Sequence, residues 1–73
     1  MVITTINNNK LFIQFDSMIA NGLISVSDNN DFTRSIAIVN SNFEAIDLPS
    51  VSDKIFITIE TDGKTVTKTI NLH

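Results

Sequence analysis

Hydrophobic and polar residues alternate along most of the chain, and this period of two predicts β-strands. In the stretch 10–16, Leu11, Ile13 and Phe15 fall on one face, and in the stretch 22–28, Ile24 and Val26 alternate with serines. The full set of predicted strands is 2–6, 10–16, 22–28, 33–40, 42–49, 54–61 and 64–70. About seven short antiparallel strands in so short a chain are typical of an all-β sandwich or barrel.

The segments between these strands contain the residues that favour turns. They are the asparagine run 7–9, the stretch 17–22, the "SDNND" cluster at 27–31, "NSN" at 40–42 and "LPSVSD" at 48–53. Asn, Asp, Ser, Gly and Pro each have a physical reason to occupy turns. The sequence therefore predicts that the chain reverses at every one of these segments.

The last two strands form a hairpin whose register can be predicted residue by residue. A two-residue loop at Asp62-Gly63 suits a type I′ turn, which needs positive φ at both positions. The predicted pairs on the core-facing side are Ile55 with Ile70, Ile57 with Lys68, and Ile59 with Val66. A slip by one residue would turn the isoleucines outward, so the pattern specifies this register. The opposite side is a threonine row that faces solvent.

Composition sets limits on what a domain of this size can do. The 73 residues predict one domain, 1–73, and a chain this short buries only about 60% of the surface that its unfolded form exposes. The absence of cysteine excludes disulfides and thiolate zinc sites. A net charge of −3 with scattered basic residues argues against nucleic acid as a partner. The apolar runs are too short to span a bilayer, and the first ten residues lack the pattern of a signal peptide.

Few residues could carry chemistry, so we expect no enzyme, no cofactor and no metal. His73 is the only histidine, and without a base no serine or threonine is activated as a nucleophile. Glu44 and Asp47 are three residues apart and point to opposite faces of a strand. Asp28 and Asp31 could offer oxygen ligands to calcium, but their spacing lacks the features of an EF-hand. We interpret "SDNND" as a polar turn, and calcium binding there stays open.

Five residues are candidates for contact with other protein chains. Phenylalanines at four positions are hard to place in the core, and several fall on the face opposite the isoleucines of their own strands: Phe12, Phe32, Phe43 and Phe56. If they lie outside the core, they form an apolar patch suited to a partner; if loops cover both faces of the sandwich, they do not. Lys68 interrupts the core side of the hairpin. It could extend its amine to water, protect an edge strand, or offer a charge to a neighbouring subunit.

The second half of the chain resembles small immunoglobulin-like modules of Bacteroidota proteins. The residues that carry this resemblance are Ile46-Asp47-Leu48, Phe56, Ile59 and Lys68-Thr69-Ile70, which are similar to motifs of the C-terminal sorting domains of type IX secretion. The chain departs from those domains at Lys54, where they have glycine, and in its last residues, where they have a basic tail. The resemblance implies a small immunoglobulin-like β-sandwich.

These observations together favour a structural or assembly protein. We expect a small virion-associated protein, such as a capsid decoration or auxiliary protein of a bacteriophage, whose partners are other protein subunits in a homo-oligomer or a larger assembly. The alternative is a secreted or cell-surface adhesion or sorting-type module, located outside the cell. A third hypothesis is a carbohydrate-binding module, but the chain has no Trp or Tyr for stacking on sugars.

Overall fold

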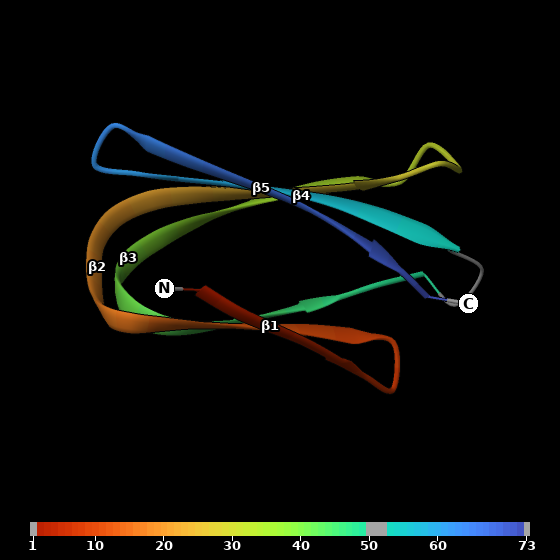
Figure 1. Cartoon of the computed structure of the whole chain (residues 1–73), viewed down its shortest axis with the longest axis horizontal. Coiled ribbons are helices and arrows are strands. Elements are labelled where there is room, and N and C mark those ends of the chain that lie inside the picture. Colours follow the sequence, from red (N-terminus) through yellow and green to blue (C-terminus); the bar gives the residue numbers. More distant parts are fainter. Residues whose placement is uncertain (1, 50–52, 73) are drawn as a thin grey trace.

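The structure, a computed structural model, describes residues 2–49 and 53–72. These described residues form a single antiparallel sheet of five strands. The strands are β1 (Val2–Asn7), β2 (Lys10–Asp28), β3 (Thr33–Asp47), β4 (Lys54–Thr61) and β5 (Lys64–Asn71). The sheet curls into two layers that lie face to face, and β2 and β3 run through both of them (Figure 1). The prediction of an all-β chain is confirmed.

Each layer contains one arm of β2 and one arm of β3. In the first layer, the N-terminal arm of β2 pairs with β1 on one side and with the C-terminal arm of β3 on the other. In the second layer, the C-terminal arm of β2 pairs with the N-terminal arm of β3 and with β4, and β4 pairs with β5. The order across the second layer is therefore β3, β2, β4, β5.

The number of separate strands differs from the prediction. Stretches 17–22 and 40–42, predicted as turns, lie inside β2 and β3, so seven predicted strands become five. The chain bends there without ending the strands, because the register between β2 and β3 shifts between Gln14 and Ile19 and Asn40 adopts a φ of 49°. A bulge of this kind bends a strand and increases its twist. Turn-forming residues therefore mark the bend but do not break the ladder.

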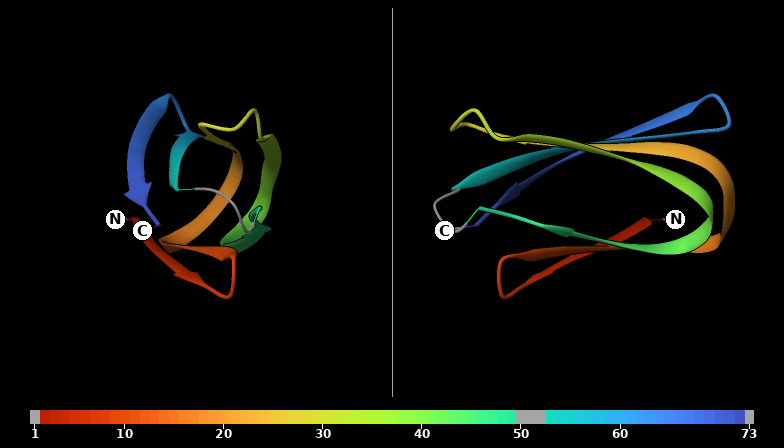
Figure 2. Two further views of the ribbon diagram at one scale, coloured as in Figure 1. Left: turned by 90° about the vertical axis from the view of Figure 1, so that its right-hand side faces the viewer. Right: turned by 180° about the vertical axis from the view of Figure 1, so that it is seen from behind.

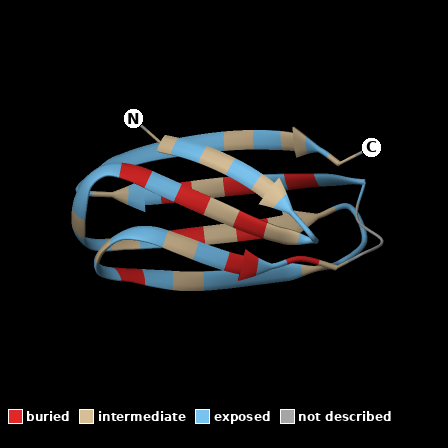
Figure 3. Cartoon of the chain, turned by 90° about the horizontal axis from the view of Figure 1, so that it is seen from below, coloured by how far each residue is buried: buried red, intermediate tan, exposed pale blue. Residues whose placement is uncertain are grey.

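The core lies between the two layers and consists of the residues that the alternating pattern placed on one face. Burial alternates along the strands (Figure 3). The described core residues are Leu11, Ile13, Phe15, Ile24, Val26, Ile38, Ile46, Leu48, Ile55, Ile57 and Ile59. Each such side chain contributes about 1.5–3 kcal/mol when it leaves water. This burial fixes which face of each strand points inward.

The C-terminal hairpin has the predicted register. Ile55 pairs with Ile70, Ile57 with Lys68, and Ile59 with Val66. Asp62 and Gly63 have φ values of 45° and 78°, as a type I′ turn requires. The asparagine turn between β1 and β2 has the same character, because Asn8 and Asn9 also have positive φ. Both turns are confirmed, whereas the predicted turn 48–53 lies partly outside the described residues.

The two long sides of the curled sheet differ. β1 and β5 lie beside each other on one side, and β3 forms the other side (Figure 2). Lys68 connects β5 to β1, since its Nζ donates a hydrogen bond of 3.0 Å to the carbonyl oxygen of Val2. The side chain of Lys68 is half-buried. Its amine therefore bonds to protein backbone rather than extending only into water.

Candidate protein-binding surface

The first layer carries a cluster of apolar side chains on its outer face. In the register of this layer, Thr5, Phe12 and Ala45 lie in one row across the three strands, and Ile3, Gln14 and Phe43 lie in the next. Ile3 is 51% exposed and Phe43 is 48% exposed. We call Ile3, Phe12, Phe43 and Ala45 the aromatic surface.

The two phenylalanines of the aromatic surface contact each other across the strands. Their ring centroids are 6.0 Å apart and the ring planes are inclined by 24°. Phe43 is the diagonal neighbour of Phe12, because Phe12 pairs with Ala45 two positions further along β3. Aromatic side chains can bridge such diagonal positions. Stacking holds both rings in one orientation, and an apolar surface of this kind suits contact with another protein.

Polar side chains fix the backbone beside Phe43, where the ladder between β2 and β3 is irregular. The Ser41 hydroxyl donates to the carbonyl of Phe43 at 2.9 Å and accepts from its N–H at 3.2 Å. The Gln14 amide donates to the carbonyls of Phe15 and Asn42 at 3.3 and 3.4 Å. These bonds pair backbone groups with side chains where the register of β2 and β3 shifts.

One border of the aromatic surface is charged. Lys10 and Asp47 pair across β2 and β3 in the row next to Phe12, with 3.4 Å between Nζ and Oδ1. The side chains are 45% and 78% exposed, so water screens the pair and it contributes little to stability. The surface therefore combines apolar side chains with a charged pair at one border and the exposed Gln14 between Ile3 and Phe43, and protein interfaces commonly mix apolar and polar groups in this way.

The structure brings two of the predicted contact residues together and separates the others. Phe12 and Phe43 form the aromatic surface. Phe56 is 39% exposed but lies on the outer face of the second layer, where it pairs with Ser27 and Thr69. Phe32 is half-buried and packs against the core. Neither of these two residues belongs to the aromatic surface, so the four phenylalanines do not form one patch.

Phe32 is held by the loop that the "SDNND" cluster forms. The carboxylate Oδ1 of Asp28 accepts the backbone N–H groups of Asn30 at 2.8 Å and of Phe32 at 2.9 Å. The N–H of Asp28 donates to the carbonyl of Phe32 at 3.1 Å, which closes the loop. Asp31 has a φ of 67°. This geometry supports the interpretation of the cluster as a polar turn.

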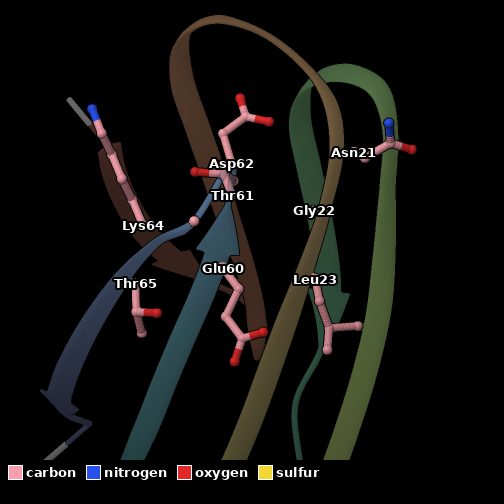
Figure 4. Close-up of a pocket in the computed structure, with 9 residues that line it drawn as sticks. Asn21, Gly22, Leu23, Glu60, Thr61, Asp62, Lys64 and Thr65 are labelled. Carbon is pink, nitrogen blue, oxygen red and sulfur yellow. The ribbon is translucent and has the colours of Figure 1, made fainter.

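A shallow hollow of about 340 Å³ lies at the bend of β2 beside the β4–β5 turn. Its lining residues are Asn21, Gly22, Leu23, Glu60, Thr61, Asp62, Gly63, Lys64 and Thr65 (Figure 4). The carboxylates of Glu60 and Asp62 point in different directions in this view, and both side chains are exposed. They do not converge on one position, so the hollow offers no built site for a ligand.

The sequence could not locate two features of this region. Nothing in the pattern showed that Phe12 and Phe43 become neighbours, because their proximity depends on the pairing of β2 with β3. The contact between Lys68 and Val2 joins residues 66 positions apart and depends on the curl of the sheet. Both contacts join residues far apart in the sequence, and the alternation within one strand does not predict which other strand it pairs with.

Comparison with known proteins gives no family for this chain. A scan against protein-family models finds no match, and a search of curated proteins finds no significant relative. In the described ranges 2–49 and 53–72, no group of three or more acidic or histidine side chains is placed to hold a metal ion. Among the same residues, no helix is both long and apolar enough to cross a membrane.

Proposed function

We propose that the protein is a non-enzymatic assembly protein that binds to a virion, as a capsid decoration or auxiliary protein of a bacteriophage. The observation that carries this proposal is the aromatic surface, in which the exposed Ile3 and Phe43 and the half-buried Phe12 lie on the outer face of the first layer. Burial of these side chains against a capsid subunit would supply binding energy that a polar layer lacks. Aromatic residues are enriched at the centres of such interfaces.

An immunoglobulin-like fold is part of this proposal, and the arrangement of the arms supports it. Counting the two arms of β2 and of β3 separately, the layers contain three and four arms. In chain order, β1 corresponds to strand A, the two arms of β2 to B and C, the two arms of β3 to C′ and E, β4 to F and β5 to G. The first layer then has the order A-B-E, and the second has the order C′-C-F-G. Immunoglobulin-like domains place the same letters in these two sheets, with D completing the first. Compact domains of this kind suit a role that depends on exposed faces and edges.

The test compares binding of purified protein to capsids that lack it. Particles from a phage deleted for the gene are incubated with labelled protein and separated on a density gradient. We expect the wild-type chain to sediment with the particles and the double variant Phe12→Ser, Phe43→Ser to lose at least about tenfold in affinity, because hot-spot aromatics contribute about 2 kcal/mol or more. Phe56→Ser is the matched control, since it removes an exposed phenylalanine from the opposite outer face.

Two results would contradict the proposal. One is a wild-type chain that does not bind particles, and the other is equal loss of binding in the control and in the double variant. Binding to intact cells in place of particles would favour the alternative, an adhesion or sorting-type module at the cell surface. Circular dichroism of all variants shows whether they remain folded.

A further inference from the structure

β3 is an edge strand in both layers. Among the described strands it pairs only with β2, so no described strand covers its other side, and only its centre has backbone groups bonded to side chains, at Asn42 and Phe43. An edge strand presents unpaired N–H and C=O groups, which can pair with a strand from another chain. At 15 residues, β3 is longer than β1 or β5, the strands on the opposite side of the sheet.

The three edges are protected in different ways, and β3 has Arg34 and Glu44 on its inward face but neither of the features that protect the other two. β5 carries Lys64 and Lys68, and β1 is short and has its Val2 carbonyl occupied by the Lys68 amine. Lysines and short lengths are the usual means by which proteins prevent pairing at an edge. β3 contains neither lysine nor proline, and it carries an exposed Val39 near its centre. Its sequence is therefore compatible with pairing to a further strand.

The charges of β3 are placed at opposite ends. Arg34 lies near the beginning of the strand, and Glu44 and Asp47 lie near its end. A parallel partner strand of the same sequence would place like charges together. An antiparallel one places the Arg34 end of each copy beside the acidic end of the other. The charges of β3 are thus complementary to those of a second, antiparallel copy of β3. A two-fold axis relates two copies in this orientation.

We propose that β3 pairs with β3 of a second copy of this chain, antiparallel and about a two-fold axis near Asn40. Asn40 lies at the middle of the strand, with seven residues on each side. The axis therefore places the N-terminal arm of one copy beside the C-terminal arm of the other. Each layer of one copy then continues into the opposite layer of its partner, and the two copies form one wider two-layer sandwich.

The register follows from the alternation of the faces. Even-numbered core residues of β3, Ile38 and Ile46, point inward in both layers, and Phe43 points outward. Residues that lie directly opposite each other on neighbouring strands point to the same face of the sheet. An inward residue of β3, which has an even number, must therefore pair with another even-numbered residue of the second copy. With Asn40 on the axis, the pairs in each arm are Thr33 with Asp47, Arg34 with Ile46, Ser35 with Ala45, and Ile36 with Glu44. Arg34 is then the diagonal neighbour of Glu44 on the same face, within reach of its long side chain.

The centre of β3 stays outside the ladder. Asn40 has left-handed backbone geometry, and the Ser41 hydroxyl occupies both backbone groups of Phe43. Pairing is required only of residues 33–36 with residues 44–47, twice in the dimer. Phe43 and Ala45 of the aromatic surface lie on β3 itself, whereas Ile3 and Phe12 lie on β1 and β2, so substitution of Phe12 separates particle binding from dimerisation.

The experiment measures the native mass of the purified chain by analytical ultracentrifugation over a range of concentrations. We expect a dimer of twice 8.1 kDa. Arg34→Glu should weaken dimerisation at least about tenfold, because two cross-strand attractions become repulsions. The double variant Arg34→Glu, Glu44→Arg restores opposite charges and should return the dissociation constant to within about threefold of the wild type. Lys54→Glu, the same charge change at an exposed position of β4, is the control and should leave the constant unchanged.

Three results would overturn the proposal. They are a wild-type chain that is monomeric at every concentration, a dimer that Arg34→Glu leaves intact, and a double variant that stays as weak as Arg34→Glu. Arg34 is exposed, so its variants should fold, and thermal unfolding of each variant checks this. The variant Phe12→Ser should still dimerise even if it no longer binds particles, which separates failure of this proposal from failure of the proposed function.

Discussion

At the scale of single residues, Lys68 shows how a residue that breaks a pattern can acquire a partner. Its position on the core side of β5 would leave an amine against apolar neighbours. The carbonyl of Val2 accepts a hydrogen bond from this amine at 3.0 Å and so joins two strands that do not pair. A hydrogen bond from a charged group contributes about 1.5–3 kcal/mol when buried, and less when it is partly exposed.

Replacement of Lys68 by methionine should therefore destabilise the protein by about 1 kcal/mol. Methionine retains the apolar stem and removes only the amine, so the change isolates the bond to Val2. Urea unfolding followed by circular dichroism measures the effect. Lys64→Met, an exposed position on the same strand, is the control and should change the free energy of unfolding by less than about 0.5 kcal/mol. Equal effects of the two substitutions would show that the bond does not stabilise the fold.

Gly22 is required for a different reason, which is the lack of space around its Cα. A Cβ at this position would lie 2.8 Å from the carbonyl oxygen of Glu60 and 3.0 Å from the Ile38 and Thr61 side chains. β2 and β4 pair here, so the backbone cannot move away without loss of the ladder.

We expect Gly22→Ala to cost about 2 kcal/mol or more, in the range of overpacked sites. Gly63→Ala is the informative comparison. It meets no atom within 4 Å, but its φ of +78° costs an L-residue about 1–2 kcal/mol. The variant Gly63→Asn tests whether backbone strain is the cause at position 63. Asparagine tolerates this backbone region, so Gly63→Asn should be more stable than Gly63→Ala. A Gly22→Ala variant as stable as the wild type would refute the steric argument.

At the scale of elements, the loop between β2 and β3 depends on one carboxylate. Asp28 accepts two backbone N–H groups, from Asn30 and Phe32, and so defines the path of the loop. Asp28→Ala should lower stability by about 1–2 kcal/mol, since both N–H groups lose their acceptor. Amide hydrogen exchange should show faster exchange at Phe32 in this variant. Asp28→Asn keeps an acceptor and should retain most of the protection; unchanged exchange in the alanine variant would exclude this role.

The strands that the sequence predicted correctly are those with strict alternation and a defined turn. The β4–β5 register followed from the isoleucine positions and from Asp62-Gly63, because a two-residue turn leaves one alignment that buries the isoleucines. The bends of β2 and β3 could not be predicted in this way. The stretches 17–22 and 40–42 contain turn-forming residues, and only pairing with a neighbouring strand decides whether such residues end a strand or bend it. The stacking of Phe12 on Phe43 depends on that same pairing.

At the scale of the whole molecule, the two layers share the same two strands. β2 and β3 each pass through both layers, so neither layer can lose its strands while the other remains intact. The core between them also takes side chains from both, such as Ile13 from the first layer and Ile57 from the second. The chain should therefore unfold as one cooperative unit, as small domains usually do.

Conservative truncations in each layer test this cooperativity. Ile13→Val and Ile57→Val remove one methylene from fully buried side chains, and each should cost about 0.5–1.5 kcal/mol. Both variants should lower the urea concentration at the midpoint of a single unfolding transition. Circular dichroism and hydrogen exchange of amides in either layer should report the same loss of stability. Ile3→Val, at a half-exposed position, should move the midpoint little. β1, β3 and β4 all pair with β2, which passes through both layers, so a variant that melted its own layer first would contradict the continuity of the bent strands.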